Sequence, residues 1–338
     1  MHNHPRMASP LMDRRRMLQL LGASAAAAAP VLTSALAAPP EVVTATKSPD
    51  SLPMQLYKSL NDQQREQVCL SIDHPRRNFV SNWWYIHRDH RINNAFDADQ
   101  QALIQTIFDG LHNPLHQEAI RKQVEVDQYG EEKNSPAVAF FGTPEDDDFE
   151  FLYTGHHVTR RCNAHTDAGT GFGGGPIFYG HFPDEFNETK DHPGNPYWYQ
   201  GKIFNRFVQS LDAEQQREGL VSGDPRSERS NQVIKKRSSN WPGLCGCDLS
   251  KEQKDGLVQT IEGMLAMFRD DDVKATVDSI RRRDLVDQLY VSWYDGKYDI
   301  GGDRVWDTWQ IESPDMVWYF RGQPHIHCYF HLKSNHPS

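Results

Sequence analysis

The sequence predicts an α+β fold, a single domain in which a mainly antiparallel sheet is flanked by capped helices. Its 338 residues suffice for one large domain or two modest ones. Two observations favour this fold. One capping pattern marks several helix starts, and the strand-like runs come in consecutive blocks that helices precede and follow. A doubly wound fold would instead alternate strands and helices.

Residues 1–37 are typical of a bacterial twin-arginine (Tat) signal peptide. Asp13-Arg14-Arg15-Arg16 precedes an apolar, alanine-rich run from Leu18 to Leu32, and Ala35-Leu36-Ala37 has the small-x-small pattern of a cleavage site. The run is too short and too weakly apolar for a stable membrane span. A retained amphipathic N-terminus is the alternative. The sequence therefore predicts the Tat export machinery as a partner and a periplasmic or extracellular location.

The remaining chain divides by composition and is acidic. Residues 38–55, rich in Pro, Thr and Ser, are expected to form a flexible leader, and residues 56–338 the domain. Removing residues 1–37 takes away four Arg and one Asp, which leaves 32 basic and 45 acidic side chains and a charge of −13. This balance argues against nucleic acid or an anionic membrane as a partner, because both need a basic patch.

Four segments share the order apolar residue, cap, two residues and Gln, which is a capping box. They are Leu60–Gln64, Phe96–Gln100, Leu211–Gln215 and Leu249–Gln253. With the apolar periodicity that follows, they predict helices near 61–71, 97–111, 115–124, 197–210, 212–221, 250–269 and 271–283. Strands are expected near 80–87, 137–142, 148–162, 175–179, 287–294, 304–311, 315–321 and 324–331. The C-terminal strands of this list, from residue 304 onward, are expected to form an antiparallel meander.

The segment from Pro324 to His331 carries the strongest sign of chemistry. On a strand, His325, His327, Tyr329 and His331 share one face. Two imidazoles two residues apart can present two nitrogen ligands to one metal ion. The alternative is an exposed edge strand that is merely rich in His. Cys328 points to the other face and is expected in the core.

Two further regions hold candidate ligands. His156 and His157 point to opposite faces if their segment is extended, so at most one is expected as a ligand, and a bulge at Gly155 would exchange them. The glycine-rich run 171–176 leads into a loop with four candidate ligands or acid–base groups, which are His181, Glu188, Asp191 and His192. A polar surface loop is the alternative for these four.

Five cysteines leave at least one unpaired in an oxidising compartment. Cys245-Gly246-Cys247 is compatible with a bridged pair, with two metal thiolates, or with two cysteines that each pair elsewhere. The sequence does not choose among the three.

Several segments resemble bacterial proteins of the DUF3500 family, over most of residues 60–333. They are Phe140–Pro144, Thr154–Val158, Gly174–His181, Asp191–Asn195, Val305–Trp309 and Phe320–His327. The resemblance implies secretion and a shared single-domain fold but no mechanism. It matches His157, His325 and His327 to recurrent histidines of the family. His181 and His192 match one subgroup, and the position of His156 varies.

Together these patterns predict a metalloprotein with one transition metal ion, Zn, Cu or Fe, acting on a small organic substrate by hydrolytic or oxidative chemistry. The expected ligands are His157, His325 and His327, completed by His181 or His192. Glu188 or Asp191 is the expected general base, and Arg321 either holds an anionic substrate group or pairs with an acid.

Two other hypotheses remain open. One is a non-catalytic periplasmic protein that binds a metal or a small ligand, which a closed shell of four ligands would favour. The other is a metal-independent hydrolase with a base such as His157. In that case His325 and His327 should lie too far from His157 to share an ion.

Overall fold

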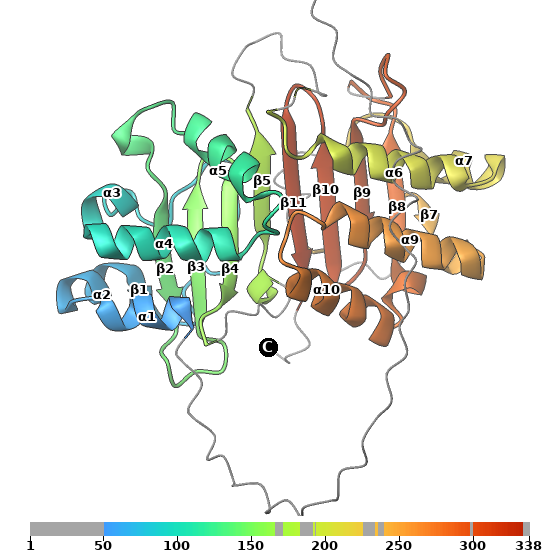
Figure 1. Cartoon of the computed structure of the whole chain (residues 1–338). Coiled ribbons are helices and arrows are strands. Elements are labelled where there is room, and N and C mark those ends of the chain that lie inside the picture. The colour runs from blue at the N-terminus through green and yellow to red at the C-terminus, as the bar shows by residue number, and fades with distance from the viewer. Residues whose placement is uncertain are drawn as a thin grey trace, which may run out of the picture. The chain divides into compact units, whose positions relative to one another are not determined.

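A computed structural model of the chain describes residues 51–165, 172–182, 192, 194–225, 234–235, 240–297 and 300–333. These residues belong to one compact unit that begins at Pro49. The predicted signal peptide, most of the predicted leader, and Glu188 and Asp191 lie outside the described residues. The fold is α+β, as predicted, with one mostly antiparallel open sheet (Figure 1). Among the described residues, no helix is both long and apolar enough to cross a bilayer.

Among the described residues the sheet has 11 strands, in the order β1-β2-β3-β4-β5-β11-β10-β9-β8-β6, and β7 pairs with β8. Their bounds are β1 Cys69–Leu70, β2 Ala137–Phe141, β3 Glu150–Gly155, β4 Val158–Asn163, β5 Ile177–His181, β6 Leu220–Val221, β7 Leu244–Cys245, β8 Tyr290–Tyr294, β9 Thr308–Glu312, β10 Met316–Arg321 and β11 Ile326–Leu332. Two antiparallel meanders, β2 to β5 and β8 to β11, meet where β5 pairs with β11. We call this pairing the seam.

The helices lie on one face of the sheet (Figure 1). Their bounds are α1 Leu52–Ser59, α2 Asp62–Val68, α3 Ile92–Ala95, α4 Ala98–Gly110, α5 Gln117–Val126, α6 Trp198–Ser210, α7 Ala213–Gly219, α9 Lys251–Met264 and α10 Asp270–Arg282. All four predicted capping boxes form, at the starts of α2, α4, α7 and α9. Local capping chemistry therefore fixes where these helices begin.

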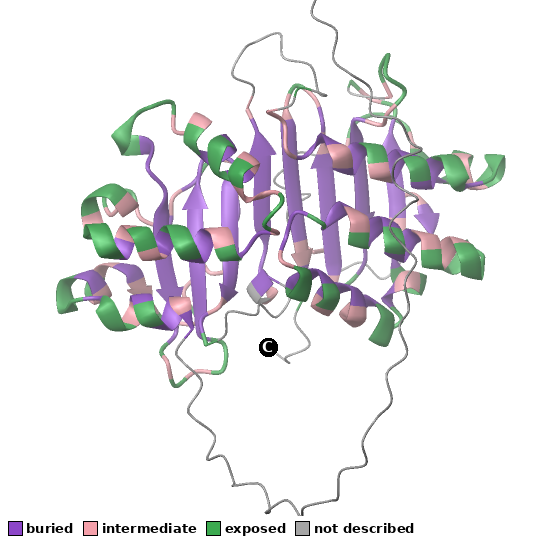
Figure 2. Cartoon of the chain, viewed as in Figure 1, coloured by how far each residue is buried: buried purple, intermediate pink, exposed green. Residues whose placement is uncertain are grey.

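The two faces of the sheet differ in chemistry. Alternate side chains such as Phe140, Phe151 and Trp318 face the helices and form the main hydrophobic core. The opposite face carries a smaller apolar cluster on the N-terminal strands. On the C-terminal strands that face carries polar and aromatic side chains, among them Gln310 and Tyr319, which are paired across β9 and β10. The strands are buried along most of their length (Figure 2).

The strand expected over 80–87 is wrong. Apart from one bridge between Trp83 and His156, this segment forms no strand. Trp84 and Ile86 pack instead on the outer face of the sheet. The Trp84 indole donates to Thr159 Oγ1 at 2.8 Å, and the Ile86 amide donates to Thr154 Oγ1 at 3.0 Å. The apolar residues of this segment therefore pack on the sheet and do not form a strand within it.

The single strand expected over 148–162 is also wrong, because β3 and β4 form a hairpin whose turn is His156-His157. Neither turn residue is Gly, Asn or Asp, so the usual sequence sign of a two-residue turn is missing. Part of the predicted leader is helical, since α1 begins at Leu52 after the Ser51 cap. Cys328 lies in the core, as predicted.

Candidate metal centre

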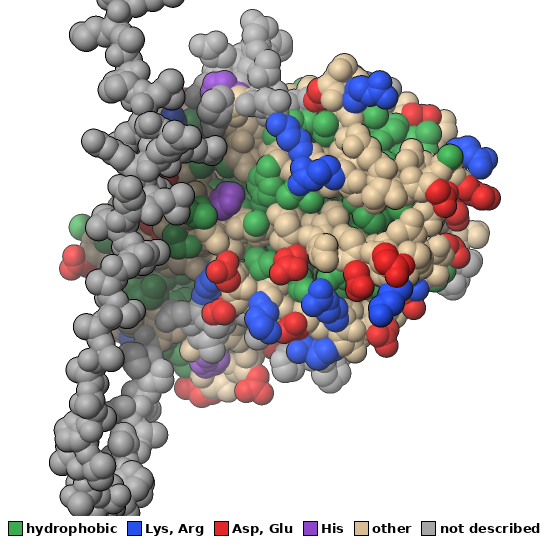
Figure 3. Space-filling view, turned by 45° about the vertical axis from the view of Figure 1, so that its right-hand side comes forward, with side chains coloured by type: hydrophobic (Ala, Val, Ile, Leu, Met, Phe, Trp, Pro, Cys, Tyr) green, Lys and Arg blue, Asp and Glu red, His purple; other side chains and the backbone are tan. Residues whose placement is uncertain are grey.

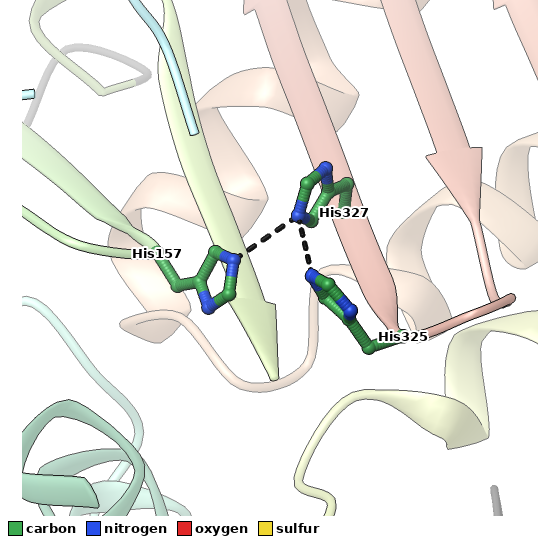
Figure 4. Close-up of side chains that lie close together, drawn as sticks. All are labelled: His157, His325 and His327. Atoms are coloured by element: carbon green, nitrogen blue, oxygen red, sulfur yellow. Dashed lines mark hydrogen bonds between the residues drawn. The ribbon is translucent and has the colours of Figure 1, made fainter. Parts of the chain in front are cut away.

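Three histidine rings converge at one end of the seam (Figure 4). His157 comes from the β3–β4 turn, His325 directly precedes β11, and His327 lies within β11. His327 Nε2 lies 3.1 Å from His157 Nε2 and 2.9 Å from His325 Nε2. Residues far apart in the sequence thus direct three nitrogen atoms at one point. We call His157, His325 and His327 the histidine triad.

Gly180 makes this convergence possible. It lies on β5, between β4 and β11, and is paired with His327. A Cβ at this position would lie 3.2 Å from the His157 ring and 2.5 Å from the carbonyl oxygen of Ile326. A bare backbone here lets the His157 ring cross β5 and reach the neighbouring strand.

His157 itself occupies an unusual backbone conformation, with φ of +52°. A left-handed residue other than glycine costs roughly 1–2 kcal/mol. Two backbone hydrogen bonds hold it, because its amide donates to the Asn82 carbonyl at 2.8 Å and its own carbonyl accepts from Gly180 N at 3.2 Å. Such strain clusters at functional positions. Here it turns the ring toward His327. His157 is therefore not extended, and the alternation that an extended His156-His157 segment would give does not apply.

A buried carboxylate orients His157 from behind. Asp127, the residue that caps the C-terminus of α5, places Oδ2 3.2 Å from His157 Nδ1. Gln123 Nε2 donates to the same oxygen at 2.5 Å, and the Gln123 carbonyl oxygen accepts from His181 Nδ1. A carboxylate only accepts, so Nδ1 of His157 carries the proton and Nε2 presents its lone pair to the triad. This is the carboxylate–histidine arrangement found behind metal ligands.

The triad is neutral near pH 7. Burial, then Arg321 and His181, lowers the pKa of His157 to about 3. Burial, then His157 and Arg321, lowers the pKa of His325 to about 3, and the pKa of His327 is also lowered, mainly by burial. Protonating any of these three rings would place a positive charge in a buried site beside Arg321. Arg321 is the residue of β10 that is paired with His327 of β11. Neutral imidazoles are the form that binds metal ions.

The triad fits a metal ion better than it fits hydrogen bonds alone. The Nε2 atom of His327 has two imidazole nitrogens within 3.1 Å, and a single N–H can be directed at only one of them. A tetrahedral ion with bonds of about 2.0–2.1 Å would hold its nitrogen ligands roughly 3.3 Å apart. The two nitrogen–nitrogen distances at His327, 3.1 and 2.9 Å, are slightly shorter than this, and all three ligand atoms lie within 4.8 Å of one another.

Ring stacking supports the turn on its outer side. The His156 ring stacks on His157, with ring centroids 3.9 Å apart, and packs at a tilt against Trp83, with centroids 4.5 Å apart. Tyr129 lies 5.5 Å from His156 on the same side. Burial, then His157, lowers the pKa of His156 to about 4. His156, His157 and Asp127 also lie close enough together to form a second group of possible ligands.

The other candidate residues are dispersed. His181 is on the helix side of β5, where it bonds Gln123 and supports Asp127. His192 is exposed, and its Nδ1 accepts from the Gly194 amide at 3.0 Å. Sequence reasoning missed Gln123 and Asp127. Neither belongs to a recognisable motif, and only the fold brings α5 to the turn.

Cys245 and Cys247 are bridged, whereas Cys162 and Cys328 are buried and Cys69 is partly buried.

A family model described as "Protein of unknown function (DUF3500)" matches residues 46–336, so the chain belongs to the DUF3500 family. No curated protein and no solved structure matches the chain. Membership confirms the resemblance drawn from the sequence segments. The chemistry has to be inferred from the geometry of the triad.

Proposed function

We propose that this DUF3500 protein is a Tat-exported metalloprotein, periplasmic or extracellular, whose histidine triad holds one transition metal ion. One observation carries the proposal. Three Nε2 atoms from two separate segments lie within hydrogen-bonding distance in a chain, His157–His327–His325, and Asp127 fixes the tautomer of the first. The metal-independent hydrolase required a large separation between His157 and the other two histidines, and the 3.1 Å distance does not meet that condition.

Three neutral imidazoles suit Zn²⁺, Cu²⁺ or Fe²⁺. Such an ion polarises a bound water or carbonyl, or activates dioxygen, according to its identity. Among the described residues, no fourth His, Cys, Asp or Glu joins the triad within ligand distance. Three protein ligands are typical of catalytic zinc sites, which keep a position for substrate or water. This supports an enzyme that acts on a small organic substrate.

The chain's own residues have separate roles in this proposal. Asp127 holds the His157 ring in place and raises its basicity as a ligand. Arg321, opposite His327 on β10, binds a negatively charged group of the substrate beside the ion. Glu188 or Asp191, outside the described residues, serves as the general base.

A second candidate function is non-catalytic binding of a metal or small ligand in the periplasm. One observation favours it: His157 and His327 are only 2% and 3% exposed. Deep burial slows exchange of the ligand and suits a carrier as well as an enzyme.

Elemental analysis by mass spectrometry tests the proposal. Exported protein without an affinity tag should contain about one equivalent of one transition metal. The His325→Ala/His327→Ala double variant should lose it, and His192→Ala, an exposed matched control, should keep it. The metal found then selects assays of ester hydrolysis or of oxygen consumption. Wild-type protein that stays metal-free after reconstitution would contradict the proposal.

A further inference from the structure

A pocket of about 680 Å³ opens on the segment 76–91, which crosses the outer face of the N-terminal strands. Three arginines line it, Arg76, Arg88 and Arg91. Aromatic side chains, including Phe79, Trp83 and Tyr85, form much of the remaining wall. We call it the arginine pocket. None of the residues of the histidine triad lines it.

The arginine pocket is basic in an acidic protein. Residues 74–91 contain four Arg and one Asp, whereas the whole chain has a charge of −10. On the face that Figure 3 shows, by contrast, acidic and basic side chains are interspersed. The pKa of His87, next to Arg88 in the sequence, responds to these surroundings. Burial first, then His90, Arg76, His74 and Arg91, lowers its pKa to about 4. No carboxylate is among the described residues that line the pocket, and a cluster of cations without a carboxylate attracts an anion.

Arg91 gives the second, independent sign of a ligand. It is only 8% exposed and lies over the Tyr85 ring, with the guanidinium carbon 3.3 Å from the ring centroid. Its Nε and Nη1 atoms are buried and have no hydrogen-bond partner among the described residues. A buried guanidinium is normally paired with a carboxylate or phosphate, because an unmatched buried charge is costly. An anionic group in the pocket would balance the charge of this guanidinium.

The wall of the pocket also offers apolar surface. Phe79 and Trp83 are 47% and 54% exposed, which is high for large aromatic side chains. Trp83 is held in place, because its indole donates to the Tyr85 hydroxyl at 3.3 Å and its ring packs against the His156 ring. Rigid aromatic rings beside guanidinium groups suit a ligand with a flat apolar body and a charged end.

We propose that the arginine pocket binds an organic carboxylate with an aromatic or alicyclic body. The carboxylate pairs with Arg91 and Arg88, and the ring packs on Trp83 and Phe79. This site is additional to the metal centre and does not depend on the proposed function of the triad.

Isothermal titration calorimetry with benzoate as the probe tests the proposal, and benzyl alcohol is the uncharged match. Wild-type protein should bind benzoate saturably and benzyl alcohol at least ten-fold more weakly. Arg88→Gln, at an exposed position, should weaken benzoate binding about three-fold. Arg91→Gln should weaken it about ten-fold or more. Arg206→Gln, an exposed arginine on α6, is the matched control and should leave binding unchanged.

Thermal melting of each variant separates loss of binding from loss of folding. If Arg91→Gln does not fold, Arg88→Gln and Trp83→Ala decide, and each should weaken benzoate binding. Equal effects of Arg88→Gln and Arg206→Gln, or equal binding of benzoate and benzyl alcohol, would overturn the proposal. The His325→Ala/His327→Ala variant should bind benzoate normally. Loss of binding there would assign the anion to the metal centre instead of the arginine pocket.

Discussion

The N-terminal and C-terminal halves of the sheet are built in the same order (Figure 1). In each half a capped helix, α2 or α7, leads into a two-residue edge strand, β1 or β6. Each edge strand runs parallel to the first strand of a four-stranded antiparallel meander. Along the chain, a second capped helix, α4 or α9, follows the edge strand and precedes the meander. The two meanders then meet at the seam.

The likeness extends to hydrogen bonds. In the N-terminal half, the amides of Gln64 and Gln100 bond reciprocally, at 2.7 and 3.1 Å. In the C-terminal half, the amides of Gln215 and Gln253 do the same, at 3.0 and 2.8 Å. All four glutamines occupy the N3 position of a capping box. A glutamine at this position thus links two helix starts as well as closing its own cap.

The halves differ where the chemistry lies. The β3–β4 turn carries His156-His157, whereas the corresponding β9–β10 turn contains Ser313-Pro314-Asp315. At the seam, His325 directly precedes β11 and His327 is the second residue of that strand, whereas β5 begins at Ile177. The repeated parts therefore provide the scaffold. The triad forms at positions where the two halves differ, and the seam brings these positions together.

Adding a methyl group at Gly180 should have the largest effect. The new Cβ of Gly180→Ala would meet the Ile326 carbonyl and the His157 ring, so the ring could not cross β5. We expect loss of the metal and destabilisation by about 1–3 kcal/mol. Gly256→Ala on α9 of the C-terminal half is the control, since a Cβ there meets nothing within 4 Å. Metal analysis and urea unfolding of both variants test this; metal retained in Gly180→Ala would contradict the geometry of the triad.

Asp127 should be the next most sensitive position. Asp127→Asn keeps the shape of the side chain but removes the charge that orients His157 Nδ1. The expected loss of metal affinity is about 10- to 100-fold. Chelator competition measures it, and Asp284→Asn, at an unrelated turn, is the control. Unchanged affinity in Asp127→Asn would show that the carboxylate does not support a ligand.

The sequence could predict the parts of this molecule that depend on near neighbours. Capping boxes revealed helix starts because the bonds span three residues, and His325 and His327 stood out because strand periodicity places them on one face. The turn at His157 could not be predicted, because its left-handed backbone is held by Asn82 and Gly180. Asp127 was missed for the same reason: its role depends on how α5 meets the turn, which no local pattern encodes.

A histidine at the other end of the seam, His331, should make the stability of the protein depend on pH. His331 lies toward the end of β11, and its Nε2 bonds the Gly174 carbonyl at 3.1 Å. Burial lowers the pKa of His331 to about 4. Its contribution to stability is therefore full above the unfolded-state pKa of about 6.5 and is lost as the pH falls toward 4.

Between pH 7 and pH 5, the wild-type free energy of unfolding should fall by about 2 kcal/mol more than that of His331→Gln. Glutamine keeps a donor for Gly174 and cannot take up a proton. Urea unfolding at the two pH values measures the difference. Equal losses in the two proteins would mean that His331 is not held neutral by burial.

The glutamine pairs should give the smallest effect and the most direct comparison of the halves. Gln100 is buried and also donates to the Ser59 carbonyl, whereas Gln253 is only partly buried. Gln100→Ala leaves buried partners without a bond and should cost about 2 kcal/mol. Gln253→Ala exposes its partners to water and should cost about 1 kcal/mol or less. Urea unfolding of the two variants measures this order.

Each double variant, Gln64→Ala/Gln100→Ala or Gln215→Ala/Gln253→Ala, should lose less free energy of unfolding than the sum of its single variants, because the paired amides share one interaction. Strict additivity in both halves would show that the capping boxes act separately and that the reciprocal bond adds nothing to the repeated scaffold.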